Sequence, residues 1–285
     1  MWWKIILLVI VGLTVIIIVA LVYGSIRWQN GTKVMHNNLN AARIPIAPKA
    51  YDSKEIDGLP APVQSYFRAV LKDGQPMVAT VSVEHTGTFN MSETSEQWKP
   101  FTSTQRVITH RPGFDWEARI QIAPGLAVKV HDAYIAGEGI LHASLFGLVS
   151  LANMRGTPEA AQAELMRFFA ETAWYPTKLL PSQGVRWKSV DDNSAKATLK
   201  DGETKLTMLF RFDENSLIES VRAEARGRIV SGAVIPTPWE GRWSHYEFHD
   251  GMLIPLEGEV AWILPEGPKP YWRGSITKLS YEFAQ

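Results

Sequence analysis

Cysteine is absent from the 285 residues of this chain. Its absence excludes disulfide bonds, thiol nucleophiles, and zinc or iron–sulfur centres with cysteine ligands. An excess of charge is also missing, since 29 lysines and arginines are balanced by 29 aspartates and glutamates. A neutral chain lacks the basic excess typical of generic nucleic-acid binding, so we expect no nucleic-acid partner. Hydrophobic residues make up 46% of the chain, which is enough for a packed core and excludes disorder over most of its length.

Motifs of the common enzyme classes are missing as well. The chain has no phosphate-binding loop, no G-x-S-x-G elbow, and no dinucleotide fingerprint between a strand and a helix. His245, Glu247 and His249 alternate along one expected strand and could offer two ligands to a metal ion, but no third ligand can be named. We therefore predict no metal site, no cofactor and no catalytic residue. The sequence favours a protein that is not an enzyme, without excluding one.

An uncharged apolar run near the start is the most specific feature. It extends over 19 residues, from Ile5 to Tyr23. As a helix this run would be roughly 28 Å long, close to the thickness of the hydrocarbon core of a bilayer. Trp2 and Trp3 precede it and Trp28 follows it, as expected of aromatic residues at the two membrane interfaces. The alternative is a cleaved signal peptide, whose apolar region is usually shorter, about 7–15 residues. We predict an uncleaved single-pass anchor and hence the lipid bilayer as a partner.

The orientation of the anchor is less marked, because Lys4 on one side is opposed by Arg27 and Lys33 on the other. The short leader favours a soluble domain outside the cytoplasmic membrane. The polar segment that follows, with two prolines, is interpreted as an extended tether. The expected division is therefore a transmembrane anchor over 1–28, a tether over 29–57 and one extracytoplasmic domain over 58–285.

Period-two alternation dominates the rest of the chain, for example in VATVSVEHTGTF, residues 78–89. Asp201–Gly202 and Asp250–Gly251 are typical hairpin turns. A helix is expected over 61–71, and another after Thr157, a good N-cap that precedes Pro158. The predicted fold class is α+β: an N-terminal transmembrane helix followed by one large curved, half-barrel-like antiparallel sheet with a few helices packed on it.

Candidate ligand-binding residues come from two patterns. Several of the 11 tryptophans lie beside proline or glycine, where aromatic side chains often surround a binding site, although core packing is the alternative. The strand LIESVRAEARGRIV alternates charged residues with Ala223, Ala225 and Gly227. We interpret its charged side as a solvated face, with an anion contact by its arginines as the alternative. The small residues opposite would leave room for a helix or a ligand. The candidates are Trp174, Arg226, Trp239, Trp262 and Trp272.

Several stretches resemble an uncharacterised bacterial family that is defined by a conserved domain of unknown function. They are AWYPTKLLPSQGVRW, DGETKLTMLFRFDE, IESVRAEARGR, PTPWEGRWSHYEFHDGMLIPLEGEVAWILPEGP and YWRG, with HDAYIAGEGILHASLFGLVSL earlier in the chain. The resemblance covers roughly Pro60 to Phe283 and is most specific from Trp174 to Gly274. It implies no activity and assigns no catalytic residue. In outline the expected fold is similar to that of the LolA-like and LppX-like lipoprotein carriers.

Three functions remain open at this point. The first is a membrane-tethered binding module for an apolar or lipid-like ligand at the cell envelope. The second is a hydrolase-type enzyme that uses histidine and carboxylate groups on the sheet. The third is a structural envelope protein without a ligand. An apolar cavity would favour the first, and convergent ionisable groups with shifted pKa values would favour the second.

Overall fold

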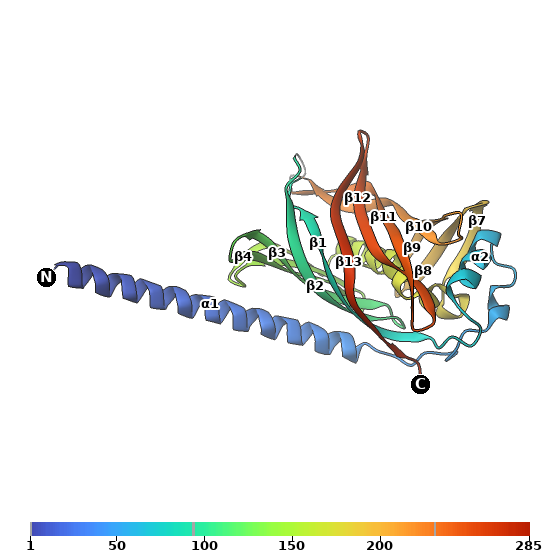
Figure 1. The fold of residues 1–285 in the computed structure, drawn as a ribbon, viewed down its shortest axis with the longest axis horizontal. Helices are drawn as coiled ribbons and strands as arrows, with labels where there is room; N and C mark the ends of the chain where they lie inside the picture. Colours follow the sequence, from blue (N-terminus) through green and yellow to red (C-terminus); the bar gives the residue numbers. More distant parts are fainter. Residues whose placement is uncertain (1, 93–94, 231) are drawn as a thin grey trace.

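The computed structural model describes residues 2–92, 95–230 and 232–285. Its described strands form a single sheet of thirteen, every neighbouring pair antiparallel (Figure 1). The strands are β1 Val78–Asn90, β2 Trp98–Ile108, β3 Gly113–Ala123, β4 Leu126–Ile135, β5 Glu138–Leu145, β6 Val149–Arg155, β7 Arg186–Asp191, β8 Ser194–Asp201, β9 Thr204–Phe212, β10 Ile218–Val230, β11 Ala233–His249, β12 Met252–Leu264 and β13 Gly267–Phe283. The α-helices are α1 Trp2–Ala41, α2 Ala61–Val70 and α3 Pro158–Ala170, and the short 3₁₀ helices are Ser53–Ile56, Glu171–Trp174, Pro176–Leu179 and Pro181–Gln183.

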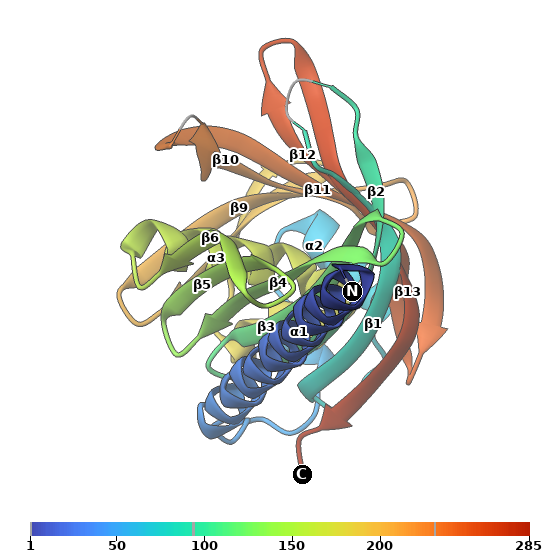
Figure 2. The same ribbon diagram turned by 90° about the vertical axis from the view of Figure 1, so that its left-hand side faces the viewer.

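The strand order is β6-β5-β4-β3-β2-β1-β13-β12-β11-β10-β9-β8-β7. Most neighbours follow one another in the chain, but the middle of the sheet joins β1 to β13. The sheet curves strongly, and α3 lies inside the curve (Figure 2). There α3 contacts β5 and β4 from one half of the sheet and β10 and β9 from the other. The predicted fold class, a large half-barrel-like antiparallel sheet with few helices, is confirmed.

Local sequence explains how these elements begin and turn. Asp250 and Gly251 both have positive φ in the β11–β12 turn, a backbone that suits an Asp-Gly pair. At the start of α3, the Thr157 hydroxyl accepts a hydrogen bond from the backbone N–H of Ala160 at 3.1 Å, and Pro158 occupies the first turn. Inside the curve, α3 buries its apolar side against the sheet, which fixes the position of its polar residues as well.

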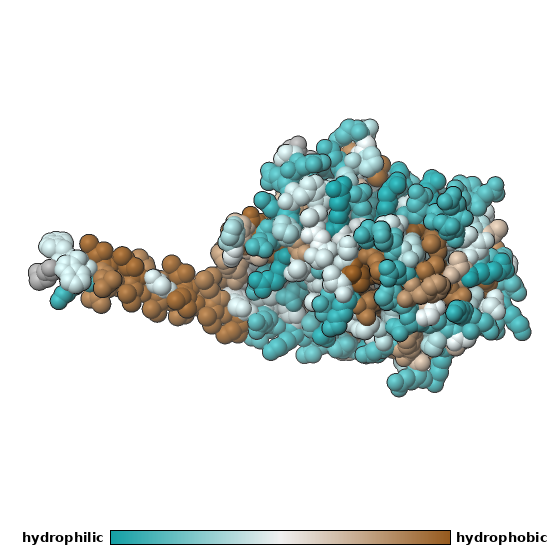
Figure 3. Space-filling view, viewed as in Figure 1, coloured by the Kyte–Doolittle hydropathy of each residue, from teal (hydrophilic) through white to brown (hydrophobic). Residues whose placement is uncertain are grey.

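Helix α1 has two halves with different surroundings. The first half is exposed and apolar and projects away from the sheet (Figure 3). Among the described residues α1 is the one helix long and apolar enough to cross a membrane, a property shared by anchors and signal sequences. The second half buries Gly24, Trp28, Thr32, Met35 and Leu39, whose spacing of three and four residues defines one face. This face packs on β2, β3 and β4.

Polar contacts hold the second half of α1 on the sheet. The Trp28 indole N–H donates to Glu117 Oε1 at 2.7 Å, and its ring stacks on His131 with 3.9 Å between ring centroids. Thr32 Oγ1 lies 2.8 Å from His131 Nε2, and His36 Nε2 lies 3.0 Å from Asp115 Oδ2. Side chains alternate between the two faces along a strand. The residues of β3 and β4 that contact α1 therefore lie on one face of the sheet, and their neighbours in the chain lie on the other.

The segment expected to be an extended tether therefore differs from expectation. Residues 29–41 are helical and packed, and Ile46 and Tyr51 farther along are buried as well. The reason is tertiary contact: the polar helix surface is complemented by histidine and carboxylate side chains of β3 and β4, which no local pattern reveals. The boundaries of the anchor and of the soluble domain stay a prediction.

Candidate ligand-binding cavity

A cavity of about 870 Å³ lies between the concave face of the sheet and α3. Its wall includes side chains from β3 and β4 on one side and from β10 to β13 on the other. Aromatic side chains form a large part of this wall, beside several charged ones. The aromatic side chains are Phe89, Trp116, Trp174, Trp239, Trp243, Trp262, Tyr271 and Trp272.

The cavity extends toward the ends of two hairpins. Asn90 and Met91 at the end of β1 line it, and so do Leu264, Glu266 and Pro268 around the β12–β13 turn. The two hairpins stand side by side at the same end of the sheet in both ribbon views (Figures 1 and 2). The cavity thus extends to the end of the sheet at which these two hairpins stand.

All five candidates from the sequence line this one cavity: Trp174, Arg226, Trp239, Trp262 and Trp272. Trp174 comes from the 3₁₀ helix after α3, and the others come from four strands between β10 and β13. Trp174, Arg226 and Trp239 are buried, whereas Trp262 and Trp272 are half-buried. The structure thus brings them together, and their role in binding remains a prediction.

The prediction that one face of β10 is charged and solvated is wrong at the centre of the strand, because β10 contains a β-bulge between Ala223 and Arg226. Ala223 pairs with Trp239 and Arg226 pairs with Thr237, so both face the same side as Trp239. Ala225 is exposed and does not share a concave face with Ala223. The bulge turns Arg226 into the cavity, where its guanidinium lies 4.8 Å from the centroid of the Trp239 ring.

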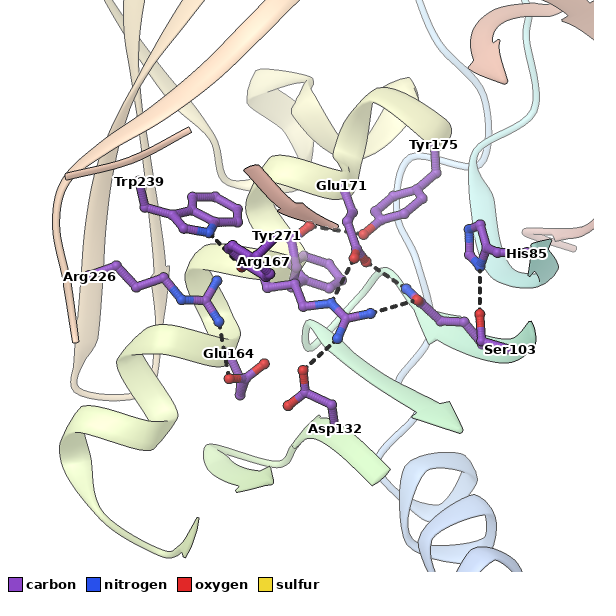
Figure 4. Close-up of polar contacts among 12 residues, drawn as sticks. His85, Ser103, Asp132, Glu164, Arg167, Glu171, Tyr175, Arg226, Trp239 and Tyr271 are labelled. Carbon is purple, nitrogen blue, oxygen red and sulfur yellow. Dashed lines mark hydrogen bonds and ion pairs between the residues drawn. The ribbon is translucent and has the colours of Figure 1, made fainter. Parts of the chain in front are cut away.

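Sequence reasoning missed a charged network on the floor of the cavity (Figure 4). Arg167 of α3 donates from Nε to Glu171 at 2.8 Å, from Nη1 to Asp132 of β4, and from Nη2 to Gln105 of β2 at 3.2 Å. Its guanidinium also lies 4.7 Å from the centroid of Trp116. Burial lowers the pKa of Arg167, but the nearby carboxylates of Glu171 and Asp132 outweigh it and raise this pKa above its ordinary value. Arg167 is therefore a fixed positive charge.

A second pair lies beside this network. Arg226 Nη2 is 3.2 Å from Glu164 Oε1 of α3, and both side chains are buried. Burial raises the pKa of Glu164 well above its usual value, and the charge of Asp132 raises it further. This raised pKa favours the neutral form of Glu164, and in that form Glu164 does not compensate the charge of Arg226.

The spacing of these α3 residues was available in the sequence. Glu164, Arg167 and Glu171 follow one another at three and four residues and so lie on one side of the helix. That side of the helix is adjacent to its apolar stripe, and the apolar stripe packs inside the curved sheet. A charged stripe on a helix buried in this way is a signal for a polar site.

Buried N–H groups without a partner are the second feature of the wall. Among the described residues, Arg226 Nη1 and the indole nitrogens of Trp116, Trp174 and Trp243 are buried and lack a hydrogen-bond acceptor. All four side chains line the cavity. A buried donor without an acceptor costs about 1–3 kcal/mol. The cavity is therefore complementary to a molecule that carries hydrogen-bond acceptors as well as apolar surface.

The histidines do not provide a catalytic group in this cavity. His85 Nδ1 lies 3.3 Å from Ser103 Oγ, but neither residue lines the cavity (Figure 4). Burial lowers the pKa of His85 to about 3, so the ring is neutral near pH 7. His245 lies 3.4 Å from Glu257 at an exposed position of β11, outside the cavity. Within the described part of the chain, no three His, Asp or Glu side chains are grouped as metal ligands.

Comparisons with known proteins place the chain in a family without assigning it a function. A family model described as a family of unknown function, DUF6920, matches residues 57–281, which confirms the expected uncharacterised family. No curated protein matches the chain. One similar solved structure is a LolA superfamily protein, NE2245 from Nitrosomonas europaea, with 10% identity and a TM-score of 0.40. The match covers 77% of this chain and 93% of that chain.

Proposed function

The chain belongs to the family of unknown function DUF6920. We propose that it is a membrane-anchored protein that binds an apolar or lipid-like ligand. The cavity of about 870 Å³ with its aromatic wall carries this proposal. Pockets for small molecules are commonly about 300–1,000 Å³, mostly apolar, with a few placed polar groups. The interior of the sheet is thus not filled by its own side chains, which argues against a purely structural envelope protein.

The apolar half of α1 supports the membrane anchor. It is uncharged after Lys4, exposed along its whole length, and continuous with a half that packs on the sheet. Cleavage of a signal peptide near residue 24 would cut the chain where the helix begins to pack, so we propose that the anchor is retained. We propose further that the soluble domain lies outside the cytoplasmic membrane. Reporter fusions after Gln285 test this: activity of a cytoplasmic reporter with silence of an exported one would reverse the orientation.

Binding is tested directly on the full chain held in amphipol. Organic extracts of the purified protein should contain a retained amphiphile by mass spectrometry. Titration with hexadecanoic acid should change the tryptophan fluorescence saturably. Trp262→Ala should weaken binding by roughly tenfold, since the indole is half-buried in the wall and stacks on Tyr271 at 5.8 Å between centroids. Trp98→Ala, outside the cavity, is the matched control. An empty extract and no saturable change would leave the structural role ahead.

A second candidate function rests on the pair formed by Asp132 and Glu164. Two carboxyl groups in one cavity, of which one has a pKa raised by burial, are typical of acid–base catalysis. Among the described residues no histidine lines the cavity, so a hydrolase built on these carboxyl groups would have to activate water directly. Release of free acid from hexadecanoyl esters, lost in Glu164→Gln, would support this function, whereas binding without turnover supports the first.

A further inference from the structure

We infer that the cavity selects amphiphiles with an anionic oxygen head group, a carboxylate or a phosphate, and that Arg226 is the residue that recognises it. This inference rests on the proposed binding function and names its ligand class. Arg226 is buried, is held over the Trp239 ring, and keeps Nη1 without an acceptor. Its other terminal nitrogen, Nη2, is oriented by Glu164 at 3.2 Å.

The remaining wall points to the same chemistry. Trp116, Trp174 and Trp243 contribute indole N–H groups that have no acceptor. These groups donate, so a head group rich in acceptor oxygens would pair with them. The wall also contains two buried carboxyl oxygens without a partner, Asp132 Oδ1 and Glu164 Oε2, which belong to β4 and α3. The carboxylates of Glu171 and Asp132 are both bound by Arg167. An anion beside Arg226 would accept a hydrogen bond from Nη1, which has no acceptor in the structure.

Three amphiphiles with the same sixteen-carbon chain test the inference on the full chain in amphipol: hexadecanoate, hexadecyl phosphate and hexadecanol. A charge-assisted hydrogen bond in a buried site predicts that both anions bind at least about tenfold more tightly than the alcohol. Arg226→Met should remove this preference. Arg222→Met on the same strand should keep it, because Arg222 bonds Glu224 outside the cavity. Glu164→Gln should keep it too, because glutamine replaces a neutral acid.

The outcomes separate the two proposals. If none of the three amphiphiles binds, the proposed binding function fails and the head-group selectivity fails with it. If all three bind equally, the cavity is a binding site without head-group selectivity, and only the inference is overturned. If an Arg226→Met variant binds the alcohol as the wild type does but still prefers the anions, Arg226 is not the residue that recognises the head group.

We infer secondly that the β5–β6 hairpin touches the same bilayer that holds α1. Its loop lies against the helix where the exposed apolar half ends. A Cβ atom at Gly24 would be 2.4 Å from the carbonyl oxygen of Phe146, and one at Gly147 would be 2.3 Å from the carbonyl oxygen of Gly24. The two glycines thus permit direct backbone contact between the helix and the loop. This inference rests on the proposed anchor, not on the cavity.

Exposed apolar side chains continue from the helix onto this hairpin. Val149 and Leu151 of β6 are 56% and 55% exposed, and Ile26 on α1 is 52% exposed. An apolar area adjoins the base of the helix in Figure 3. Arg27 on α1 and Lys129 on β4 lie nearby: Arg27 acts electrostatically on His142 of β5, and Lys129 Nζ lies 5.8 Å from the Trp28 ring centroid. Apolar side chains flanked by cations suit the interface of a phospholipid bilayer.

The absence of cysteine makes the test simple, because one introduced cysteine is a unique labelling site. Leu151→Cys and, on the opposite edge of the sheet, Val190→Cys, at a position 49% exposed in the wild type, are labelled with an environment-sensitive fluorophore. The full chain is placed in vesicles of phosphatidylcholine and phosphatidylglycerol that carry a lipid-bound quencher. We expect several-fold stronger quenching at position 151 than at position 190. Replacing Val149 by Asp should reduce the quenching at position 151.

Flotation of the vesicles shows whether the anchor holds. Equal quenching at both positions in protein that floats would overturn the second inference and leave the anchor standing. Protein that does not float would overturn both the anchor and the contact of the hairpin. Strong quenching at position 151 that persists with Asp at position 149 would exclude this apolar surface as its cause.

Discussion

Acid should weaken the contact between α1 and the sheet through His131. This side chain is 3% exposed and lies between the Trp28 ring and the hydroxyl of Thr32. Burial lowers its pKa from 6.5 to about 3, and the charges of His142 on β5, His36 on α1 and Lys129 on its own strand contribute in the same direction. His131 is therefore protonated less readily in the folded protein than in the unfolded chain.

The sign and the size of the effect follow from this difference. A pKa that is depressed in the folded state contributes its full stability above pH 6.5, and that stability is lost as the pH falls from 6.5 toward 3. One pKa unit corresponds to about 1.4 kcal/mol. At pH 5 the folded state has lost about 2 kcal/mol through His131 alone. The carboxylates of Asp115 and Glu117 on the same face are paired to His36 and Trp28 of α1, and these pairs are the same in all the proteins compared below.

Urea unfolding of the full chain in detergent micelles at pH 7.5 and pH 5 measures this loss. His131→Gln keeps a hydrogen-bonding group near Thr32 but takes up no proton. We expect its free energy of unfolding to fall by about 2 kcal/mol less than that of the wild type over this pH range. The exposed His245→Gln should follow the wild type, and the contribution of buried His85 cancels because all three proteins retain it. Identical pH profiles for His131→Gln and wild type would refute the reasoning.

Three further predictions concern packing. Arg167→Met should lower the free energy of unfolding by about 3–5 kcal/mol in urea titrations, because it leaves the Glu171 carboxylate buried without its partner. Glu164→Gln should change it by less than about 1 kcal/mol at pH 7, since burial raises the pKa of this carboxyl and so favours its neutral form, and a larger loss would show that it is ionised. Gly24→Leu should release the second half of α1 and speed hydrogen exchange there at least about tenfold, while Gly12→Leu, with nothing within 4 Å, should not.

The sequence predicted those parts of the structure that depend on local chemistry. Strand alternation, the Asp250–Gly251 turn and the Thr157 cap depend on neighbouring residues only, and all three are in the structure. The candidate tryptophans of the C-terminal strands lie together because neighbouring strands contribute them: Trp239 is on β11, Trp262 on β12 and Trp272 on β13. Trp239 and Trp262, for example, are paired across β11 and β12. Their role in binding remains a prediction.

Features that depend on tertiary contact were not predictable in this way. The second half of α1 has a polar sequence with Gly31 and several asparagines, which favour helix weakly, and it is held by partners about 90–100 residues away in the chain. The bulge after Ala223 lies opposite Pro238, which has no N–H to donate to the ladder, but this signal can be recognised only once β10 and β11 are known to pair. The bulge turns Arg226 from an expected solvated face into the cavity. Register changes of one residue reverse the direction of every following side chain.

The pairing of β1 with β13 has a consequence for how the chain folds during synthesis. Strands β1 to β6 can form as a series of hairpins as soon as they are made, and so can β7 to β13. The seam between these halves, where Val81 pairs with Tyr281, closes a loop of about 200 residues. Loop closure of this length is slow and must wait until β13 has left the ribosome. Until then β1 exposes an unpaired edge in the centre of the future sheet, so any chaperone that assists this protein would be needed at that edge.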